Sequence, residues 1–300
     1  MRLSSLVGWC GLSLAMLLPA APLAQEQPLP DLTTLIARAR ANVRSDRELL
    51  SQYTYLERRA DVRVSKLAKV STGPVKVYQV YPGAEDIETY RRLIEVDGRP
   101  VPRDELDKQD RERQREVMDA VARRQRESPR DRDKRLARRE QAEREEQRVI
   151  DELFQIYTFT MVGRQTVDGR PAIALDFVPG GSLVPKTDAG KLMKKVRGRV
   201  WVSEGDYQVA RVQAEMLDDI SVLGFLGKLY KGTTASFERR KVNDEIWLPA
   251  EARFDGSGRA FVRKFQVGSV VQYSDYRKFS VETDTSFELP PNSPTSPSRR

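Results

Sequence analysis

The side chains that could do chemistry in this chain are carboxylates and amines, because the sequence has no histidine and a single cysteine, Cys10. Without an imidazole, neither a Ser-His-Asp nor a Cys-His arrangement can form within the chain. Zinc sites built from histidine and cysteine are excluded for the same reason. A carboxylate pair or a Ser-Lys pair remains open, since the chain has 44 acidic residues, but no such pair stands in an identifying motif. The sequence therefore predicts no catalytic residues, no metal site, no cofactor and no enzymatic activity.

Two short acidic segments resemble metal-binding loops, namely Glu204-Gly205-Asp206 and Asn243-Asp244. Each lies between two segments with the composition of strands. Hairpin turns favour Asp, Asn and Gly because these residues tolerate the backbone conformations that a tight turn needs. We therefore interpret both segments as turns.

The net charge of +8 and the pI near 9.5 raise the question of an anionic partner. Nucleic acid is disfavoured, because positive and negative charges are interleaved and the chain begins with an export signal. An anionic membrane surface, contacted peripherally, or a cell-wall polymer suits an exported basic protein better. A soluble surface with a slight excess of arginine is the simplest interpretation of all.

The first 24 residues have the pattern of a secretory signal peptide. Arg2 precedes an apolar run over 3–18, and small residues lead to a predicted cleavage site after Ala24. The run is shorter than the roughly 20 apolar residues of a membrane span. A lipoprotein signal is disfavoured, because Cys10 lies in the middle of the apolar run and is preceded by Trp9. Cleavage would remove the cysteine, so we expect an exported protein without disulfides.

A helix is predicted next, after a linker over 25–30. Asp31 is a suitable N-cap, and Leu32, Leu35, Ile36 and Ala39 recur at helical spacing up to about Leu50. At the other end, residues 286–300 are rich in proline and serine and are predicted to be disordered.

Most of the remaining chain has the residue composition and alternation typical of β-strands. Asp97-Gly98 and Asp168-Gly169 are strong turn signals, and short loops such as 242–245 and 255–258 separate the later strands. Consecutive strands with short turns predict antiparallel meanders. The predicted strands are 53–56, 62–64, 75–81, 88–96, 154–162, 165–167, 171–178, 199–202, 208–212, 233–241, 246–254, 259–267 and 270–279. A loose lysine-rich connection is expected over 179–195.

Residues 103–148 interrupt this pattern with interleaved arginine and acidic residues and few large apolar ones. Such charge patterning supports helices through pairs four residues apart. Ser128-Pro129 divides the segment, with Ser128 as N-cap of the second helix. We expect two long exposed helices or one kinked helix, without the sustained heptads of a stable coiled coil. The insertion is either an arm that binds a partner or a solvated insertion.

The most apolar stretch of the mature chain is 220–230, and it supplies the candidate ligand-binding residues. If this stretch is helical, its apolar side chains form a hydrophobic lid or a cavity wall for an acyl chain, and Gly224 and Gly227 loosen it. An ordinary core connection is the alternative. Tryptophans on predicted strands either join the core or line a cavity. The candidate residues are Val222, Leu223, Phe225, Leu226, Leu229, Tyr230, Trp201 and Trp247.

Several hairpin segments resemble those of the LolA-like superfamily of periplasmic proteins, which includes lipoprotein-sorting factors, lipid-binding lipoproteins and an envelope-stress regulator. The resemblance is carried by Gly169-Arg170-Pro171 with the strand after it, by 198–212, and by Ile246-Trp247-Leu248-Pro249. It covers about 31–100 and 150–285, and the charged insertion and the 179–197 connection depart from the simplest carriers.

The resemblance implies an α+β, mainly β fold, in which helices cover an incomplete antiparallel β-barrel with an apolar cavity. One such domain would span 31–285, interrupted by the long charged helical insertion 103–148. The implied function is a periplasmic carrier or binding protein for the acyl chains of a lipid or lipoprotein, without covalent chemistry. The alternative is an envelope interaction or stress-sensing protein that binds a protein partner through 103–148.

Overall fold

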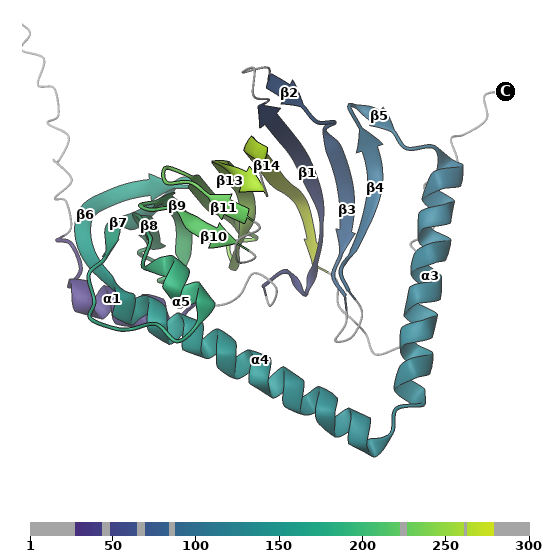
Figure 1. The fold of residues 1–300 in the computed structure, drawn as a ribbon, viewed down its shortest axis with the longest axis horizontal. Coiled ribbons are helices and arrows are strands. Elements are labelled where there is room, and N and C mark those ends of the chain that lie inside the picture. Colours follow the sequence, from purple (N-terminus) through teal and green to yellow (C-terminus); the bar gives the residue numbers. More distant parts are fainter. Residues whose placement is uncertain are drawn as a thin grey trace, which may run out of the picture.

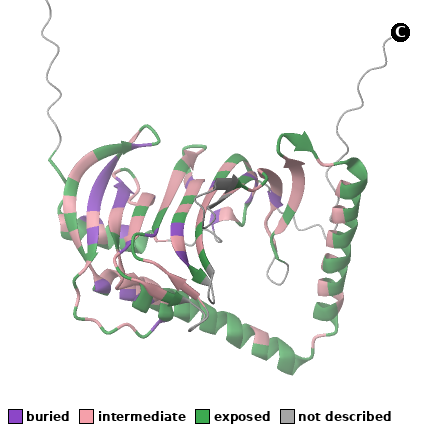
Figure 2. Cartoon of the chain, turned by 45° about the horizontal axis from the view of Figure 1, so that its top comes forward, coloured by how far each residue is buried: buried purple, intermediate pink, exposed green. Residues whose placement is uncertain are grey.

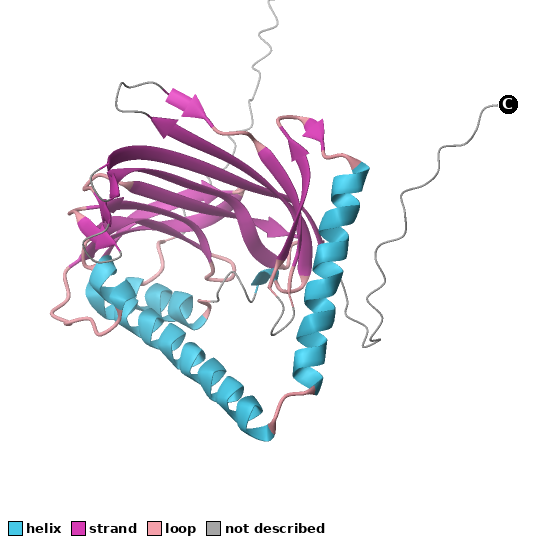
Figure 3. Cartoon of the chain, turned by 45° about the vertical axis from the view of Figure 1, so that its right-hand side comes forward, coloured by secondary structure: helices cyan, strands magenta, loops and turns pink. Residues whose placement is uncertain are grey.

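The computed structural model of this protein describes residues 28–43, 49–64, 70–83, 88–222, 227–260 and 263–278. In these residues the chain forms one curved antiparallel sheet with helices gathered on one side of it (Figures 1 and 3). The predicted signal peptide and the predicted C-terminal tail lie outside the described residues. The expectation of a mainly β fold with an unclosed barrel is confirmed.

The sheet has 14 strands, and its main path runs in the order β5-β4-β3-β1-β14-β13-β12-β9-β8-β7-β6. The short strands β2, β10 and β11 pair off this path. The strands are β1 (Tyr53–Val64), β2 (Val70–Thr72), β3 (Lys76–Tyr81), β4 (Tyr90–Val96), β5 (Arg99–Pro100), β6 (Tyr157–Val167), β7 (Arg170–Pro179), β8 (Val196–Ser203), β9 (Val209–Met216), β10 (Ile220–Val222), β11 (Gly227–Leu229), β12 (Thr234–Val242), β13 (Ile246–Ala260) and β14 (Arg263–Lys278).

The first and last long strands pair at the centre of the sheet. The register of β1 with β14 runs from Tyr53 opposite Lys278 to Val64 opposite Gln266. This pairing joins the β1–β5 part of the sheet to the β6–β13 part. The path ends at β5 on one side and at β6 on the other, so the sheet does not close into a barrel.

Two predicted turns have the backbone conformation that their sequences demand. Asp97 and Gly98 have φ values of 50° and 75°, and Asp168 and Gly169 have values of 50° and 71°. Positive φ at both central residues produces the twist that a two-residue hairpin needs. The β4–β5 and β6–β7 hairpins are therefore set by local sequence.

The helices are α1 (Leu32–Ala41), α3 (Arg103–Gln125), α4 (Pro129–Ile156) and α5 (Asp188–Met193). The α3 helix leaves β5 at one edge of the sheet, and α4 leads directly into β6 at the other edge (Figure 1). The helical hairpin of α3 and α4 thus connects the two edges. The predicted division at Ser128-Pro129 is confirmed, because Ser128 caps α4 and accepts a hydrogen bond from the Asp131 amide at 3.2 Å.

Many buried residues lie on the strands at the left of Figure 2. They form separate apolar clusters on the two faces of the sheet. On β7, Ile173, Leu175 and Phe177 pack beneath α1, against Leu35 and Ala39. Ala172 and Ala174, on either side of Ile173, point to the opposite face and join a second cluster. Alternation of side chains along a strand explains this division.

Several predicted element boundaries are wrong. The first helix begins after the Asp31 cap, as predicted, but ends at Ala41 with Asn42 as C-cap instead of reaching Leu50. Residues 154–156, predicted as strand, still belong to α4, because Ile156 is buried at the end of that helix. The 179–195 connection contains the short helix α5, whose N-cap Thr187 accepts a hydrogen bond from the Gly190 amide.

The C-terminal strands are longer than predicted. Residues 255–258, expected to form a loop, lie within β13, and β14 continues through the predicted break near 268. Glycine weakens a strand unless a neighbour covers its backbone. Here a Cβ at Gly256 would lie 2.9 Å from the Phe254 ring, and one at Gly258 would lie 2.9 Å from the Phe265 ring. The two rings therefore cover the glycines and keep the strand continuous.

In the apolar segment 220–230, the described residues 220–222 and 227–229 form strands and not the helix that a lid would require. Ile220 pairs with Leu229, and β11 also pairs with the end of β13, at Gly258–Ala260. Pairing on two sides holds β11 in the sheet. Residues 223–226, with the candidate ligand-binding Leu223, Phe225 and Leu226, lie outside the described residues.

Candidate functional site

The apolar face beneath α1 continues across the sheet. Directly paired residues of neighbouring strands point to the same side of a sheet. One row of directly paired residues therefore crosses this face of the sheet, from Leu175 on β7, beneath α1, to Val271 on β14. The row consists of Leu175, Val200, Val212, Phe237, Ala252 and Val271. Every member is apolar.

A second row lies beside the first on the same face and carries no charge. Its members are Phe177, Gly198, Ala214, Ala235, Phe254 and Ser269. Along β14, Val267 and Phe265 alternate onto this face too, and Leu229 on β11 joins it through its pairing with Gly258. Leu229 is thus a predicted site residue that lies on this face.

The α1 helix covers these two rows over only part of the sheet. The cluster packed beneath α1 extends to Val212 and Ala214 on β9. Beyond β9, Phe237, Phe254, Phe265 and Val267 are partly exposed, although they are large and apolar. Among the described residues, α3 packs on β4, α4 on β6 and α5 on β8. We call the surface formed by Leu229, Phe237, Phe254, Phe265, Val267 and Val271 the open floor.

Charged side chains follow the open floor at its β1 end. Val271 pairs with Arg59 on β1, and Arg59 pairs with Lys76 on β3. Glu57 lies two residues before Arg59 on β1, and its side chain is only 2% exposed. Its carboxylate contacts the guanidinium groups of Arg59 at 3.0 Å and of Arg91 at 3.2 Å. The row that begins beneath α1 as apolar core therefore ends in cations.

The two predicted tryptophans are buried. Trp201 lies between Val200 and Val202 on β8 and so points away from the α1 face, with 4% of its surface exposed. Trp247 is fully buried in the same cluster as Trp201, and its indole N–H donates to Asp206 at 2.9 Å. That Asp206 also accepts a hydrogen bond from Lys241 at 2.5 Å, so the predicted turn residue is part of a structural network.

The remaining candidates lie near the open floor or outside the described side chains. Tyr230 follows Leu229 and is partly exposed, with its amide bonded to the Ser257 carbonyl. The backbone of Val222 belongs to β10. The floor aromatics Phe237, Phe254 and Phe265 were missed by sequence reasoning, because only the pairing register shows that they share a face. Their signal is the spacing of two in Ala235-Ser236-Phe237 and in Ala252-Arg253-Phe254.

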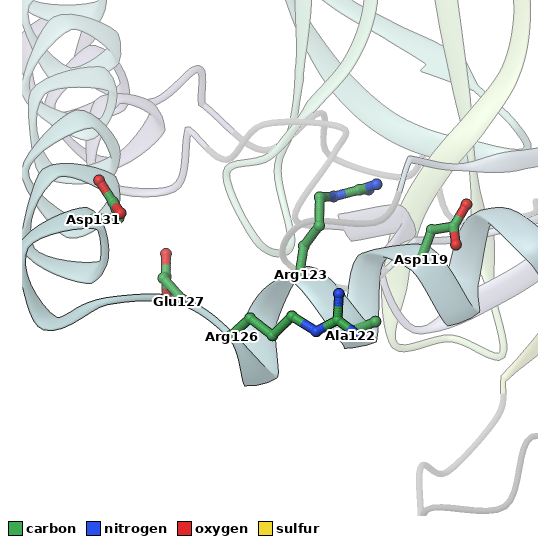
Figure 4. Close-up of a pocket in the computed structure, with 6 residues that line it drawn as sticks. All are labelled: Asp119, Ala122, Arg123, Arg126, Glu127 and Asp131. Carbon is green, nitrogen blue, oxygen red and sulfur yellow. The ribbon is translucent and has the colours of Figure 1, made fainter.

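Two hollows lie in the described part of the chain. One of about 510 Å³ lies at the elbow between α3 and α4 and is lined by Asp119, Ala122, Arg123, Arg126, Glu127 and Asp131 (Figure 4). Another of about 820 Å³ crosses β7 to β14, and its lining includes the polar row Asp176, Arg199, Gln213, Ser236 and Arg253 together with Phe177, Ala235 and Phe254 of the uncharged row. Asp176 and Arg199 pair there through two hydrogen bonds of 2.6 and 3.0 Å. The charged walls of the hollow at the elbow do not suit an apolar ligand, whereas the second hollow borders the open floor at Phe254.

The α3 helix is fixed to the edge strand β4 by side chains. The Gln109 amide accepts from the Leu93 N–H at 2.9 Å and donates to the Leu93 carbonyl at 3.2 Å. Asp110 accepts two hydrogen bonds from Arg92, at 2.9 and 2.7 Å, and one from Tyr90. Burial and the hydrogen bond to Asp110 raise the pKa of Tyr90, so the phenol stays protonated as a donor. The hairpin is thereby anchored at its first end.

At its second end the hairpin is anchored through Glu152. This carboxylate on α4 is buried and accepts from the Thr187 hydroxyl at 2.5 Å and from the Lys186 amide at 2.7 Å. The Thr187 hydroxyl, together with the backbone amides, holds the pKa of Glu152 below its ordinary value. This contact between α4 and α5 is therefore strongest with Glu152 ionised, and it is lost as the pH falls through the pKa of that carboxyl.

Neither a metal site nor a membrane-spanning helix is found among the described residues. No group of three or more metal-ligating side chains is close enough together to hold an ion. No helix there combines the length and the apolar character needed to cross a membrane.

No protein-family model matches the chain, and no curated protein matches it. Solved structures do. A putative outer membrane lipoprotein-sorting protein domain from Vibrio parahaemolyticus is 8% identical, with a TM-score of 0.28 over 82% of this chain and 91% of that one. A LolA superfamily protein from Nitrosomonas europaea is 9% identical, with a TM-score of 0.27 over 83% and 94%. The MucA/MucB complex of Pseudomonas aeruginosa matches at 11% identity, with a TM-score of 0.21 over 83% and 99%.

Likenesses at this level of identity and TM-score do not transfer a ligand or a partner to this chain. Folds are shared by proteins with unrelated ligands. The function has to be argued from the chain's own surface.

Proposed function

We propose that this protein is an exported, periplasmic binding protein that holds an acyl chain of a lipid or lipoprotein on the open floor, without covalent chemistry. The observation that carries the proposal is the continuation of the apolar core rows from beneath α1 across β12, β13 and β14, where Phe237, Phe254, Phe265 and Val267 remain partly exposed. Soluble proteins rarely leave a contiguous apolar surface without an occupant.

The dimensions and chemistry of the open floor suit an alkyl chain. From Phe265 to Val271 the floor extends for six residue steps along β14, which is about 20 Å. Burying a methylene yields about 0.8 kcal/mol, so ten buried methylenes yield about 8 kcal/mol. That energy corresponds to a dissociation constant of about 1 μM before the cost of immobilising the ligand. Binding of this strength is reversible, as a carrier requires.

A charge placed on the open floor is expected to abolish binding. We predict that Phe237→Asp weakens the affinity for a fluorescent fatty acid by more than about tenfold, because an ionised carboxylate resists burial against an alkyl chain. The matched control is Ser236→Asp, which places the same charge one residue away on the opposite face of β12. Titration of both variants, with circular dichroism to check the fold, measures the difference.

Native mass spectrometry of protein purified without detergent from an exporting host tests the same proposal with natural ligands. Wild-type protein should carry an extractable lipid mass that Phe237→Asp lacks and Ser236→Asp retains. Equal fatty-acid affinity in all three proteins, with no bound lipid, would exclude the open floor as an acyl site.

The alternative function, contact with an envelope protein through 103–148, has one observation in its favour. The α3 and α4 helices expose the apolar side chains of Met118 (63%), Val121 (46%) and Leu136 (47%). If the hairpin only connects the sheet edges, a photo-crosslinker at Met118 should capture no protein in cells beyond what one at the charged, exposed Lys108 captures. A single defined adduct formed only from position 118 would favour the partner-binding function.

A further inference from the structure

The charges beside the open floor have an arrangement that a simple hydrophobic surface does not need. Glu57 is almost fully buried, yet its two carboxylate oxygens contact two different arginines, Arg59 through Nη2 and Arg91 through Nε. A buried carboxylate that contacts two guanidinium groups holds both of them in position. Its single negative charge balances only one of their two positive charges. The side chains of Arg59 and Arg91 remain 45% and 48% exposed.

All of these groups lie on the same face as the open floor. Glu57 and Arg59 are two residues apart on β1, and Arg59 stands directly opposite Val271. Arg91 reaches the same face through the pairing of Tyr55 with Val80 and of Val80 with Arg91. Paired side chains lie about 5 Å apart, so Arg59 adjoins the apolar surface, and Arg91 reaches the same site through its contact with Glu57.

The local charge is positive. Arg59, Arg91 and Lys76 supply three cations on this face, against the carboxylates of Glu57 and Asp61. Asp61 is further engaged by the Ser269 hydroxyl at 2.8 Å. The arginine fork favours carboxylate and phosphate oxygens as partners.

We propose that the open floor selects an anionic amphiphile, with the alkyl chain on the floor and the acidic headgroup bound by Arg59 and Arg91. This inference rests on the proposed function and adds the ligand class to it. A carboxylate headgroup would come from a free fatty acid, and a phosphate from a phospholipid or another phosphorylated lipid. Glu57 is a positioning residue, because it orients the two arginines and does not contact the ligand.

Calorimetric titration with dodecyl ligands below their micellar concentrations tests the selection. Dodecanoate and dodecyl phosphate carry the two acidic headgroups, and dodecyl maltoside carries a neutral one on the same chain. We expect the better of the two acidic ligands to bind roughly tenfold more tightly than the maltoside. A preference for the phosphate over the carboxylate would identify the phosphorylated lipid as the source, and the reverse preference would identify the fatty acid.

The double variant Arg59→Gln with Arg91→Gln should remove the preference and leave binding of the maltoside unchanged. Arg58→Gln is the matched control. Arg58 lies between Glu57 and Arg59 in sequence and points to the other face of the sheet. Among the described residues, its guanidinium group donates a hydrogen bond to Gln272. Glu57→Gln should tighten binding of the acidic ligands, because it removes the countercharge and keeps a similar shape.

The outcomes separate this inference from the proposed function. Equal binding of acidic and neutral ligands by the wild type, or a preference that survives the double arginine variant, would overturn the selection of anionic amphiphiles and leave the acyl site intact. Absence of binding by every dodecyl ligand would refute the acyl site itself.

Discussion

Trp247→Ala is expected to destabilise the protein by about 4 kcal/mol. The side chain is fully buried, packs in one cluster with Trp201, Ala210 and Val167, and supplies the indole N–H that donates to Asp206. Truncation leaves a large cavity and removes a hydrogen bond from a carboxylate. Although burial by itself raises the pKa of Asp206, hydrogen bonds from Lys241, Ser203 and Trp247 hold that pKa below its ordinary value, so the carboxylate stays ionised and needs its donors.

Equilibrium unfolding in urea, followed by fluorescence and circular dichroism, measures this loss. Trp247→Phe is the control, because it keeps most of the packing and removes only the indole N–H, and it should cost roughly 1–2 kcal/mol. If Trp247→Ala cost less than about 1 kcal/mol but impaired acyl binding, Trp247 would line a ligand cavity, as the sequence interpretation allowed, and would not belong to the core.

Joining Pro102 directly to Val149 should prevent folding, because the α3–α4 hairpin connects opposite edges of the sheet. Ten strand-to-strand steps separate β5 from β6 in the sheet order, which is about 48 Å along its curve. The helices have the reach to bridge this, since 23 residues of α3 extend about 35 Å and 28 residues of α4 about 42 Å. After the deletion, residues 149–156 would remain, and even fully unwound they reach only about 28 Å.

The control for this deletion is a glycine-serine linker of the same number of residues in place of 103–148. It restores the reach but not the contacts of Gln109 with Leu93 or of Asp110 with Arg92. We expect the linker protein to fold with lowered thermal stability and the directly joined protein to show no cooperative transition by circular dichroism. A directly joined protein that unfolds like the wild type would identify the hairpin as a removable arm.

Local sequence predicts much of this fold because several elements are set by local chemistry. The Asp-Gly turns at 97–98 and 168–169, the Asp31 cap and the Ser128-Pro129 division depend on neighbouring residues only. The strand at 255–258 could not be predicted in this way, because its glycines are tolerated only where the rings of Phe254 and Phe265 cover them. Such cover comes from tertiary packing, which outweighs intrinsic strand propensity.

The candidate site was harder to predict than the fold. Sequence reasoning selected the longest apolar run, 220–230, and so found Leu229, but not the floor residues that are spread over three strands. Phe237, Phe254 and Val271 become neighbours only through the register of β12, β13 and β14. The role of Glu57 is equally invisible in sequence, where it is one acidic residue among 44.

The central position of β14 has a consequence for the biogenesis of the protein. This strand is the last of the chain in the described residues, yet it lies between β1 and β13 and joins the two parts of the sheet. Contacts of such long sequence separation form slowly, because a large loop must close before they are made. A nascent chain therefore cannot complete its sheet on the ribosome before residue 278 has emerged. Delayed folding keeps a polypeptide threadable through a translocation pore, as the predicted export signal requires.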